Sequence, residues 1–145
     1  MKLVVQRVLF GEVKVEGKIV GSVNSGLFVL VGIKGGDIIE NAKYLADKLL
    51  KLRILSDENG KMNLSVIDKK NSILAVSQFT LYANTQGGNR PSFIDAGDPE
   101  EAEEIYNYFI QYIRNKGVTV KTGEFGAYME ISVKLDGPVT IILEK

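Results

Sequence analysis

The sequence predicts an α+β fold rich in strands, with a mostly antiparallel, barrel-like or mixed sheet and two main helices packed on it. Three observations lead to this prediction. Short apolar runs alternate with turn residues in the first third of the chain, and two later segments carry apolar residues at helical spacing. The C-terminal segment alternates apolar and polar side chains, as a half-buried strand does. Since no internal repeat, linker or low-complexity tract interrupts residues 1–145, we expect one domain.

Strands account for the first third of the chain. Residues 3–10 are apolar apart from Gln6 and Arg7, and they predict the first strand. The sequence Glu16-Gly17-Lys18 lies between valine-rich and isoleucine-containing segments and predicts a hairpin turn. Residues 24–26 form another turn signal before the continuous apolar run 27–31, which we interpret as a core strand.

Two helices have recognisable starts. We expect Asp37 to cap the first, with Glu40 three residues later completing a capping box. The second has Asp98 as its cap, Pro99 in its first turn and Gly117 as a stop signal. Their apolar faces are predicted to contain Ile38, Ala42, Leu45, Leu49 and Leu52, and Ala102, Ile105, Tyr106, Phe109, Ile110 and Ile113.

Near the C-terminus, residues 129–135 alternate as a half-buried strand, residues 136–138 interrupt it, and residues 139–143 start another strand. Between the two halves of the chain runs one long loop, residues 83–97. A loop of this length without its own structure is usually functional or disordered, so a rim over a site and a mobile connection both remain open.

Composition restricts the chemistry. The chain has 18 basic and 18 acidic residues, so no global positive field attracts nucleic acid. It has neither histidine nor cysteine, which excludes a Ser-His-Asp triad, a thiol nucleophile, a disulfide and a zinc site with these ligands. We predict no cofactor and no metal. A catalyst built from this chain must use hydroxyls, backbone N–H groups, carboxylates, Lys, Tyr or groups of the substrate.

The N-terminal apolar run breaks at Gln6 and Arg7, too early for the core of a signal peptide. No stretch approaches the length that spans a membrane. A cytoplasmic protein without membrane contact is therefore the expectation.

The most informative segment follows the apolar run 73–76, where the chain continues with Ser77, Gln78, Phe79 and Thr80. A buried strand that ends in polar side chains requires partners for them, because an unpaired buried polar group costs about 1–3 kcal/mol. Neighbouring backbone or a bound ligand would each supply those partners. The long loop follows directly and is placed to form a rim over this segment.

Two motifs together, Ser77-Gln78-Phe79-Thr80-Leu81 and Gly137-Pro138-Val139-Thr140, resemble the D-aminoacyl-tRNA deacylases of the D-tyrosyl-tRNA deacylase type. The resemblance extends over nearly the whole chain, because other family landmarks lie between the motifs. These include Gln6-Arg7-Val8, Gly60-Lys61-Met62-Asn63-Leu64, Arg90-Pro91-Ser92-Phe93, Thr122-Gly123 and Met129.

The resemblance implies a homodimer that hydrolyses the ester joining a D-amino acid to the 3′-terminal adenosine of tRNA. It implies a cis bond between Gly137 and Pro138, which project from one subunit into the active site of the other beside residues 77–80. There they block the side chain of an L-amino acid. Since glycine has no side chain to block, we expect some activity on glycyl-tRNA. One position departs from the family: Leu135 stands where an asparagine is usual.

We expect backbone N–H groups near Phe79 and Thr80 to stabilise the oxyanion, with Ser77 and Gln78 holding the segment rigid. The hydroxyl of Thr80 is either a nucleophile or a group that positions water. We favour positioning with attack assisted by the substrate, because an internal threonine without a nearby base is a poor nucleophile.

Other roles come with alternatives. The resemblance implies that Arg7 holds the Gly-Pro loop of the facing subunit, whereas a surface-paired charge is the plain interpretation. Met129 lines the amino-acid pocket or belongs to the core. From their position in the loop, Phe93 and Arg90 are expected to meet the terminal adenosine or phosphates of the substrate. The resemblance implies that Thr140 accompanies the Gly-Pro pair in substrate binding. Candidate contacts for the tRNA acceptor stem, otherwise solvated surface, are Lys48, Lys51, Arg53, Lys69 and Lys70.

Two other classes of function stay open. A non-catalytic RNA-binding module would bind tRNA without turnover, although the zero net charge speaks against it. An esterase acting on other activated esters would turn over simple esters without tRNA.

Overall fold

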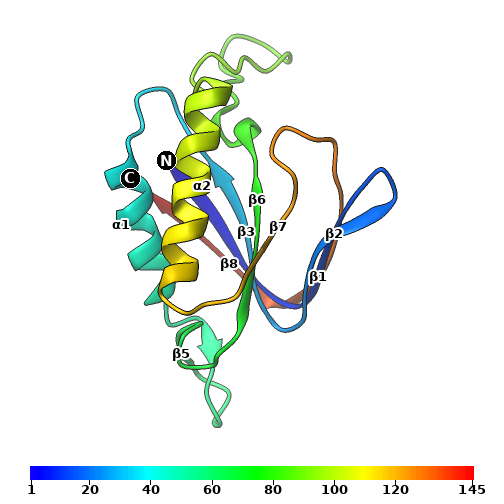
Figure 1. The fold of residues 1–145 in the computed structure, drawn as a ribbon, viewed down its shortest axis with the longest axis vertical. Coiled ribbons are helices and arrows are strands. Elements are labelled where there is room, and N and C mark those ends of the chain that lie inside the picture. Colours follow the sequence, from blue (N-terminus) through cyan, green and yellow to red (C-terminus); the bar gives the residue numbers. More distant parts are fainter.

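A six-stranded sheet with both helices on one of its faces forms the body of the molecule (Figure 1). The computed structural model describes all residues, 1–145. In chain order its elements are β1 (Lys2–Val15), β2 (Lys18–Val23), β3 (Gly26–Gly32), α1 (Ile39–Leu50), β4 (Leu55–Ser56), β5 (Met62–Leu64), β6 (Ser72–Ser77), a 3₁₀ helix (Phe79–Tyr82), α2 (Pro99–Asn115), β7 (Val120–Thr122) and β8 (Glu130–Glu144). The predicted α+β class with two main helices is confirmed.

The sheet has the order β2-β1-β3-β6-β7, and β8 pairs with β1. Pairs are antiparallel except β3 with β6 and β6 with β7, which are parallel. The long strand β1 pairs with β3 through its first half and with β2 through its second half. At the far edge β2 approaches β7 so closely that a Cβ on Gly21 would overlap the carbonyl oxygen of Thr122. The sheet therefore curls into a nearly closed barrel.

The hairpin between β1 and β2 turns at the predicted place. Glu16 and Gly17 have φ of +49° and +75°. Positive φ at both central residues is the signature of a two-residue type I′ turn, whose twist matches that of the flanking strands. A left-handed conformation favours glycine, which explains the residue at position 17.

The start of α1 differs from its prediction. The residue before the helix is Ile38, whose side chain cannot cap it, and the expected cap by Asp37 is wrong. The carboxylate of Asp37 instead accepts hydrogen bonds from the Met1 ammonium at 2.6 Å, the Lys34 N–H at 2.7 Å and the Asn41 side chain at 2.8 Å. A tertiary ion pair has thus replaced the local capping bond.

The predicted start and end of α2 are confirmed. The Asp98 carboxylate accepts from the N–H groups of Glu100 and Glu101 at 3.0 and 3.5 Å, and Pro99 is the first residue of the helix. Gly117 follows the helix with a φ of +84°. Neither helix has the length and apolar character needed to cross a membrane.

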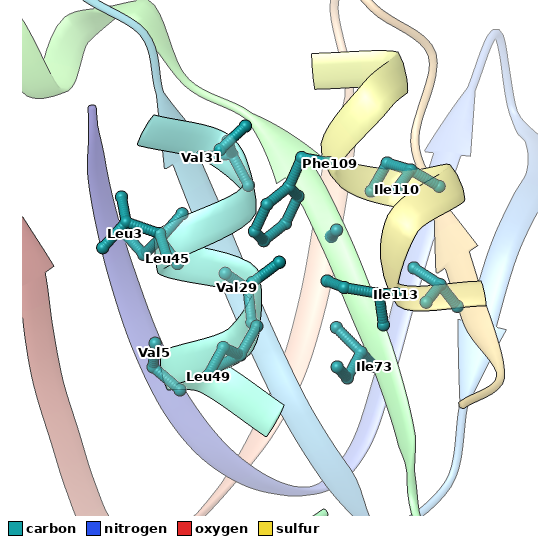
Figure 2. Close-up of a cluster of buried hydrophobic side chains, with 14 of the residues drawn as sticks. Leu3, Val5, Val29, Val31, Leu45, Leu49, Ile73, Phe109, Ile110 and Ile113 are labelled. Carbon is teal, nitrogen blue, oxygen red and sulfur yellow. The ribbon is translucent and has the colours of Figure 1, made fainter. Parts of the chain in front are cut away.

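The main core lies between the sheet and the two helices. Figure 2 shows Phe109 of α2 pointing into this layer with Leu45 and Leu49 of α1, opposite Val29 on the sheet. The predicted face of α2 is fully confirmed, whereas on α1 Ile38 is exposed. A smaller apolar cluster fills the inside of the barrel and consists of Val8, Val13, Val23, Phe28, Leu74 and Val76.

The prediction that residues 136–138 divide the C-terminal segment into two strands is wrong. Instead β8 is one strand with a bulge opposite Arg7: Gln6 pairs with Thr140 and Val8 with Leu135. Bulges and strand edges are where a sheet accommodates proline, because proline has no N–H to pair. The bond between Gly137 and Pro138 is cis, as the resemblance implies.

Candidate active site

A cavity of about 610 Å³ opens where β6 ends, between the start of α2 and the segment that leads into β8. Its polar end is formed by Ser77 and Gln78. Apolar side chains form most of the remaining wall, among them Phe79, Phe93 and Met129. Its size and its few polar groups in a mostly apolar wall are typical of small-molecule sites. This first cavity is the candidate active site.

The strand β6 holds the polar end in place. It runs parallel to β3 with Ser77 opposite Val31, and the N–H of Gln78 donates to the carbonyl oxygen of Val31 at 2.8 Å. The chain then turns into the 3₁₀ helix, in which the first N–H groups have no partner within the helix. Those groups belong to Phe79 and Thr80. The segment thus offers backbone donors at the end of a rigid strand.

Thr80 is exposed and is not one of the residues that line the cavity. Its oxygen accepts a hydrogen bond from the side-chain amide of Gln78 at 2.5 Å. An amide N–H cannot take up a proton, so this contact orients the hydroxyl without activating it as a nucleophile.

The long loop 83–97 contributes to the wall of the cavity. The rings of Phe93 and Phe79 meet edge to face with centroids 5.0 Å apart, and Ala96 and Gly97 also line the cavity. The loop is pinned by backbone hydrogen bonds between Asn84 and Ser92, at 2.8 Å in both directions. Of the two interpretations of this loop, its geometry fits the rim over the site.

Met129 lines the cavity and is partly buried, and it also packs against the smaller apolar cluster inside the barrel. A Cβ on Gly123 would collide with its sulfur, so the glycine of the Thr122-Gly123 pair leaves room for this side chain. Sequence reasoning missed Tyr128, which lines the same cavity and is 90% exposed. No periodic pattern identifies a residue in a turn of this kind.

The second motif lies elsewhere in the chain. Gly137, Pro138 and Thr140 are exposed on β8 and do not line the first cavity. The Thr140 oxygen accepts from the side-chain amide of Gln6 at 3.2 Å. Within one chain, therefore, the structure does not bring the two motifs together.

Arg7 is nine-tenths buried, which excludes the interpretation as a surface charge. Its Nε lies 2.8 Å from the carboxylate of Asp136, and its Nη1 donates to the carbonyl oxygen of Ile54 at 3.0 Å and to the Ser56 hydroxyl at 3.3 Å. Arg7 thus holds the residue before Gly137 in its own chain. The contact with a facing subunit that the resemblance implies stays a prediction.

The basic residues considered for the acceptor stem lie outside the cavity. They are exposed and belong to the end of α1 and the segments after it. Arg53 is bound to Asn63 through its side chain. The remaining four, Lys48, Lys51, Lys69 and Lys70, form no ion pair within the chain.

Comparison with known proteins points in one direction. The family model described as D-Tyr-tRNA(Tyr) deacylase matches residues 4–144. The chain is 52% identical over 144 residues to the D-aminoacyl-tRNA deacylase of Bacillus pumilus, covering 99% of this chain and 98% of that protein. It is 51% identical over 144 residues to the protein of the same name from Clostridium botulinum (strain Alaska E43 / Type E3), covering 99% and 97%.

Solved structures agree on the fold. A structure described as c-Myc DNA Unwinding Element Binding Protein has a TM-score of 0.94 and 43% identity, covering 100% of this chain and 99% of that one. A structure described as a probable eukaryotic D-amino acid tRNA deacylase has a TM-score of 0.85 and covers 98% and 97%. At 17% identity the second likeness shows a shared fold.

Proposed function

Because the chain belongs to the D-Tyr-tRNA(Tyr) deacylase family, we propose that it hydrolyses the ester between a D-amino acid and the 3′-terminal adenosine of tRNA. The products are the free D-amino acid and tRNA. The observation that carries this proposal is the first cavity, whose polar end, Ser77 and Gln78, lies at the end of a rigid strand. We assign the activity to residues 1–145 as one domain and to the cytoplasm.

The chemistry needs no histidine or cysteine, because an aminoacyl ester is already activated. Water attacks the ester carbonyl carbon, and the carbonyl oxygen becomes an oxyanion. In our proposal the N–H groups of Phe79 and Thr80 stabilise that charge. The carbon–oxygen bond to the ribose then breaks, and the proton released by the attacking water reaches the departing 3′ oxygen through the adjacent ribose hydroxyl. The protein's main contribution is orientation of the ester.

We assign positioning of water or of the ester to Thr80, whose hydroxyl lies next to the cavity and is bonded to Gln78, a residue of the cavity's polar end. Single-turnover rates of Thr80→Ser and Thr80→Val test this role. We expect Thr80→Ser to remain close to wild type and Thr80→Val to be slower. Near-normal rates in both variants would remove any role of Thr80, and an acyl-enzyme that accumulates would make it the nucleophile.

Rejection of L-amino acids is assigned to Gly137 and Pro138 of a second subunit in a homodimer. Both residues are exposed within the chain, and the same strand leaves Leu135 41% exposed and Ile142 63% exposed. Apolar side chains on an open strand favour cover by a partner. A Gly-Pro turn beside the ester would collide with the side chain of an L-amino acid. Glycine carries only a hydrogen at that position and would not collide, so we also propose activity on glycyl-tRNA.

A nucleic-acid-binding module without catalysis is the second candidate, since the name of one similar structure refers to DNA binding. The net charge of zero argues against it, because non-specific binding relies on neutralising phosphates. An esterase for other activated esters would turn over simple esters in the absence of tRNA.

The test compares deacylation of D-tyrosyl-tRNA and L-tyrosyl-tRNA by the wild type, by Pro138→Ala and by Lys134→Ala. The last variant is a control on the same strand, with an exposed side chain. We expect the wild type and the control to remove the D ester and spare the L ester, and Pro138→Ala to lose discrimination. Equal wild-type rates on both esters, or none, would refute the proposed function.

A further inference from the structure

Tyr128 lines the first cavity, yet its own chain leaves the side chain almost uncovered. The side chain is 90% exposed and belongs to neither of the two apolar clusters. Its ring is paired with no other aromatic ring and with no cation of the chain. Packing of the fold therefore does not explain a large ring at this position.

The backbone on both sides of Tyr128 is nevertheless held in place. Before it, Phe125 packs against the main core, and its ring lies near that of Tyr106, with centroids 5.8 Å apart. After it, Met129 packs against the smaller apolar cluster inside the barrel. Tyr128 is thus carried at the wall of the cavity by a segment that is anchored at two points, while its side chain stays free to contact a ligand.

Exposed aromatic side chains are concentrated at this cavity. The chain exposes five of them, which are Phe10, Tyr44, Phe79, Phe93 and Tyr128, and the last three line the first cavity. Phe79 and Phe93 already contact each other edge to face. Exposed apolar groups that gather in one place mark binding sites, and aromatic rings in particular bind planar rings by stacking or by edge contacts.

We infer that Tyr128 is a substrate-binding residue of the first cavity, where its ring packs against a planar ring of the bound ester. This inference rests on the proposed function, which supplies the ester. Two rings of such a substrate qualify, namely the adenine of the terminal nucleotide and the ring of an aromatic D-amino acid. Tyrosine binds either ring through the same contact, which involves its ring and not its hydroxyl. Tyr128 therefore contributes affinity for the substrate rather than a group for the chemical step.

Deacylation of D-tyrosyl-tRNA and of D-alanyl-tRNA tests this inference and identifies the ring. We expect Tyr128→Phe, which keeps the ring, to remain close to the wild type. Tyr128→Ala should lower kcat/KM about tenfold, equivalent to about 1.4 kcal/mol, chiefly through a higher KM. A loss on both substrates would assign the contact to adenine, and a loss on D-tyrosyl-tRNA alone would assign it to the amino acid. Unchanged kinetics of Tyr128→Ala on both substrates would overturn the inference.

The matched control is Tyr44→Ala, which removes an exposed tyrosine of α1 that does not line the cavity. This control should keep the wild-type values. Tyr128→Ala should keep the wild-type midpoint of urea unfolding, because its side chain lies outside both apolar clusters. It should also keep the wild-type mass in solution. A change of mass would mean that the ring serves a contact between subunits, and would overturn the inference.

Binding separates this inference from the proposed function. An analogue in which an amide replaces the ester between D-tyrosine and adenosine is titrated against the wild type and Tyr128→Ala by calorimetry. We expect Tyr128→Ala to bind it about tenfold more weakly. Such a loss, together with a wild type that deacylates no aminoacyl-tRNA, would support the contact and refute the activity. Deacylation by the wild type, together with equal binding of the analogue by both proteins, would refute the contact alone.

Discussion

Replacing Arg7 with methionine, which keeps most of the side-chain length but removes the guanidinium, should loosen the Gly-Pro turn from the body of the chain. Arg7 connects the residue before that turn, Asp136, to the carbonyl oxygen of Ile54 and the hydroxyl of Ser56. Without the guanidinium, a buried carbonyl group and a partly buried carboxylate lose their partner. We expect both a loss of stability and a less precisely placed turn.

The magnitude follows from these contacts. Breaking a buried ion pair typically costs about 3–5 kcal/mol. The Asp136 side chain is 37% exposed, so water replaces part of what the guanidinium supplied, and the expected loss falls to about 2–4 kcal/mol. A domain of 145 residues is stable by about 7–20 kcal/mol. The Arg7→Met protein should therefore still fold.

Urea unfolding of the wild type, Arg7→Met, Asp136→Asn and the double variant measures the coupling between the two side chains. We expect the two losses to be less than additive by at least about 1 kcal/mol, because the second change removes an interaction that is already gone. Deacylation by the folded variant should show L-tyrosyl-tRNA hydrolysed at least about tenfold faster than by the wild type, or about 1.4 kcal/mol of lost rejection.

Two results would refute this reasoning. Strictly additive losses would mean that Arg7 and Asp136 do not stabilise one another. Full rejection of L-tyrosyl-tRNA by a destabilised Arg7→Met protein would mean that the position of the Gly-Pro turn is independent of Arg7.

Three further predictions concern the fold. Phe109→Ala should lower the free energy of unfolding by about 3–5 kcal/mol, because the ring is fully buried between helices and sheet; a loss below about 1.5 kcal/mol in urea would contradict this (Figure 2). Asp98→Ala should cost about 1 kcal/mol by removing the cap of α2, and a loss no larger than that of the exposed control Glu104→Ala would disprove the cap. The pKa of Asp57 lies below its usual 3.8, chiefly because the carboxylate accepts from the N–H of Lys61. A lowered pKa contributes stability above the unfolded pKa, and that stability is lost as the pH falls through the folded pKa. Asp57→Asn should therefore be less stable than the wild type near neutral pH, and the difference should shrink as the pH falls below 3.8. A stability difference that is the same at neutral and acid pH would count against this role of Asp57.

Local patterns were sufficient for much of the fold. The turn at Glu16 and Gly17 lies where two strands change direction, and the cap, proline and glycine signals of α2 lie at its observed ends. These features depend on residues within a few positions of one another, whose φ/ψ preferences and backbone bonds act in isolation. The short strands β4, β5 and β7 were not predicted, because two or three residues show no periodicity.

The candidate site was predicted only in part. The polar end of β6 was recognisable because Ser77 and Gln78 follow a buried apolar run. The meeting of Phe79 with Phe93, across a loop, depends on where that loop folds back. The unpaired hydroxyl of Tyr82 has no signature in the sequence, because it depends on which residues pack around that side chain in the fold.

The class of fold, the helix faces and the exclusion of histidine and cysteine chemistry follow from the order and types of the residues alone. The folded chain determines which local signal is used: Asp37 binds the ammonium of Met1, 36 positions away, and does not cap the backbone N–H groups of α1. It likewise decided that Arg7 faces the bulge in β8 and holds Asp136. The reason is physical, since a charge brought within 3 Å by strand pairing outweighs a helix cap worth about 1 kcal/mol.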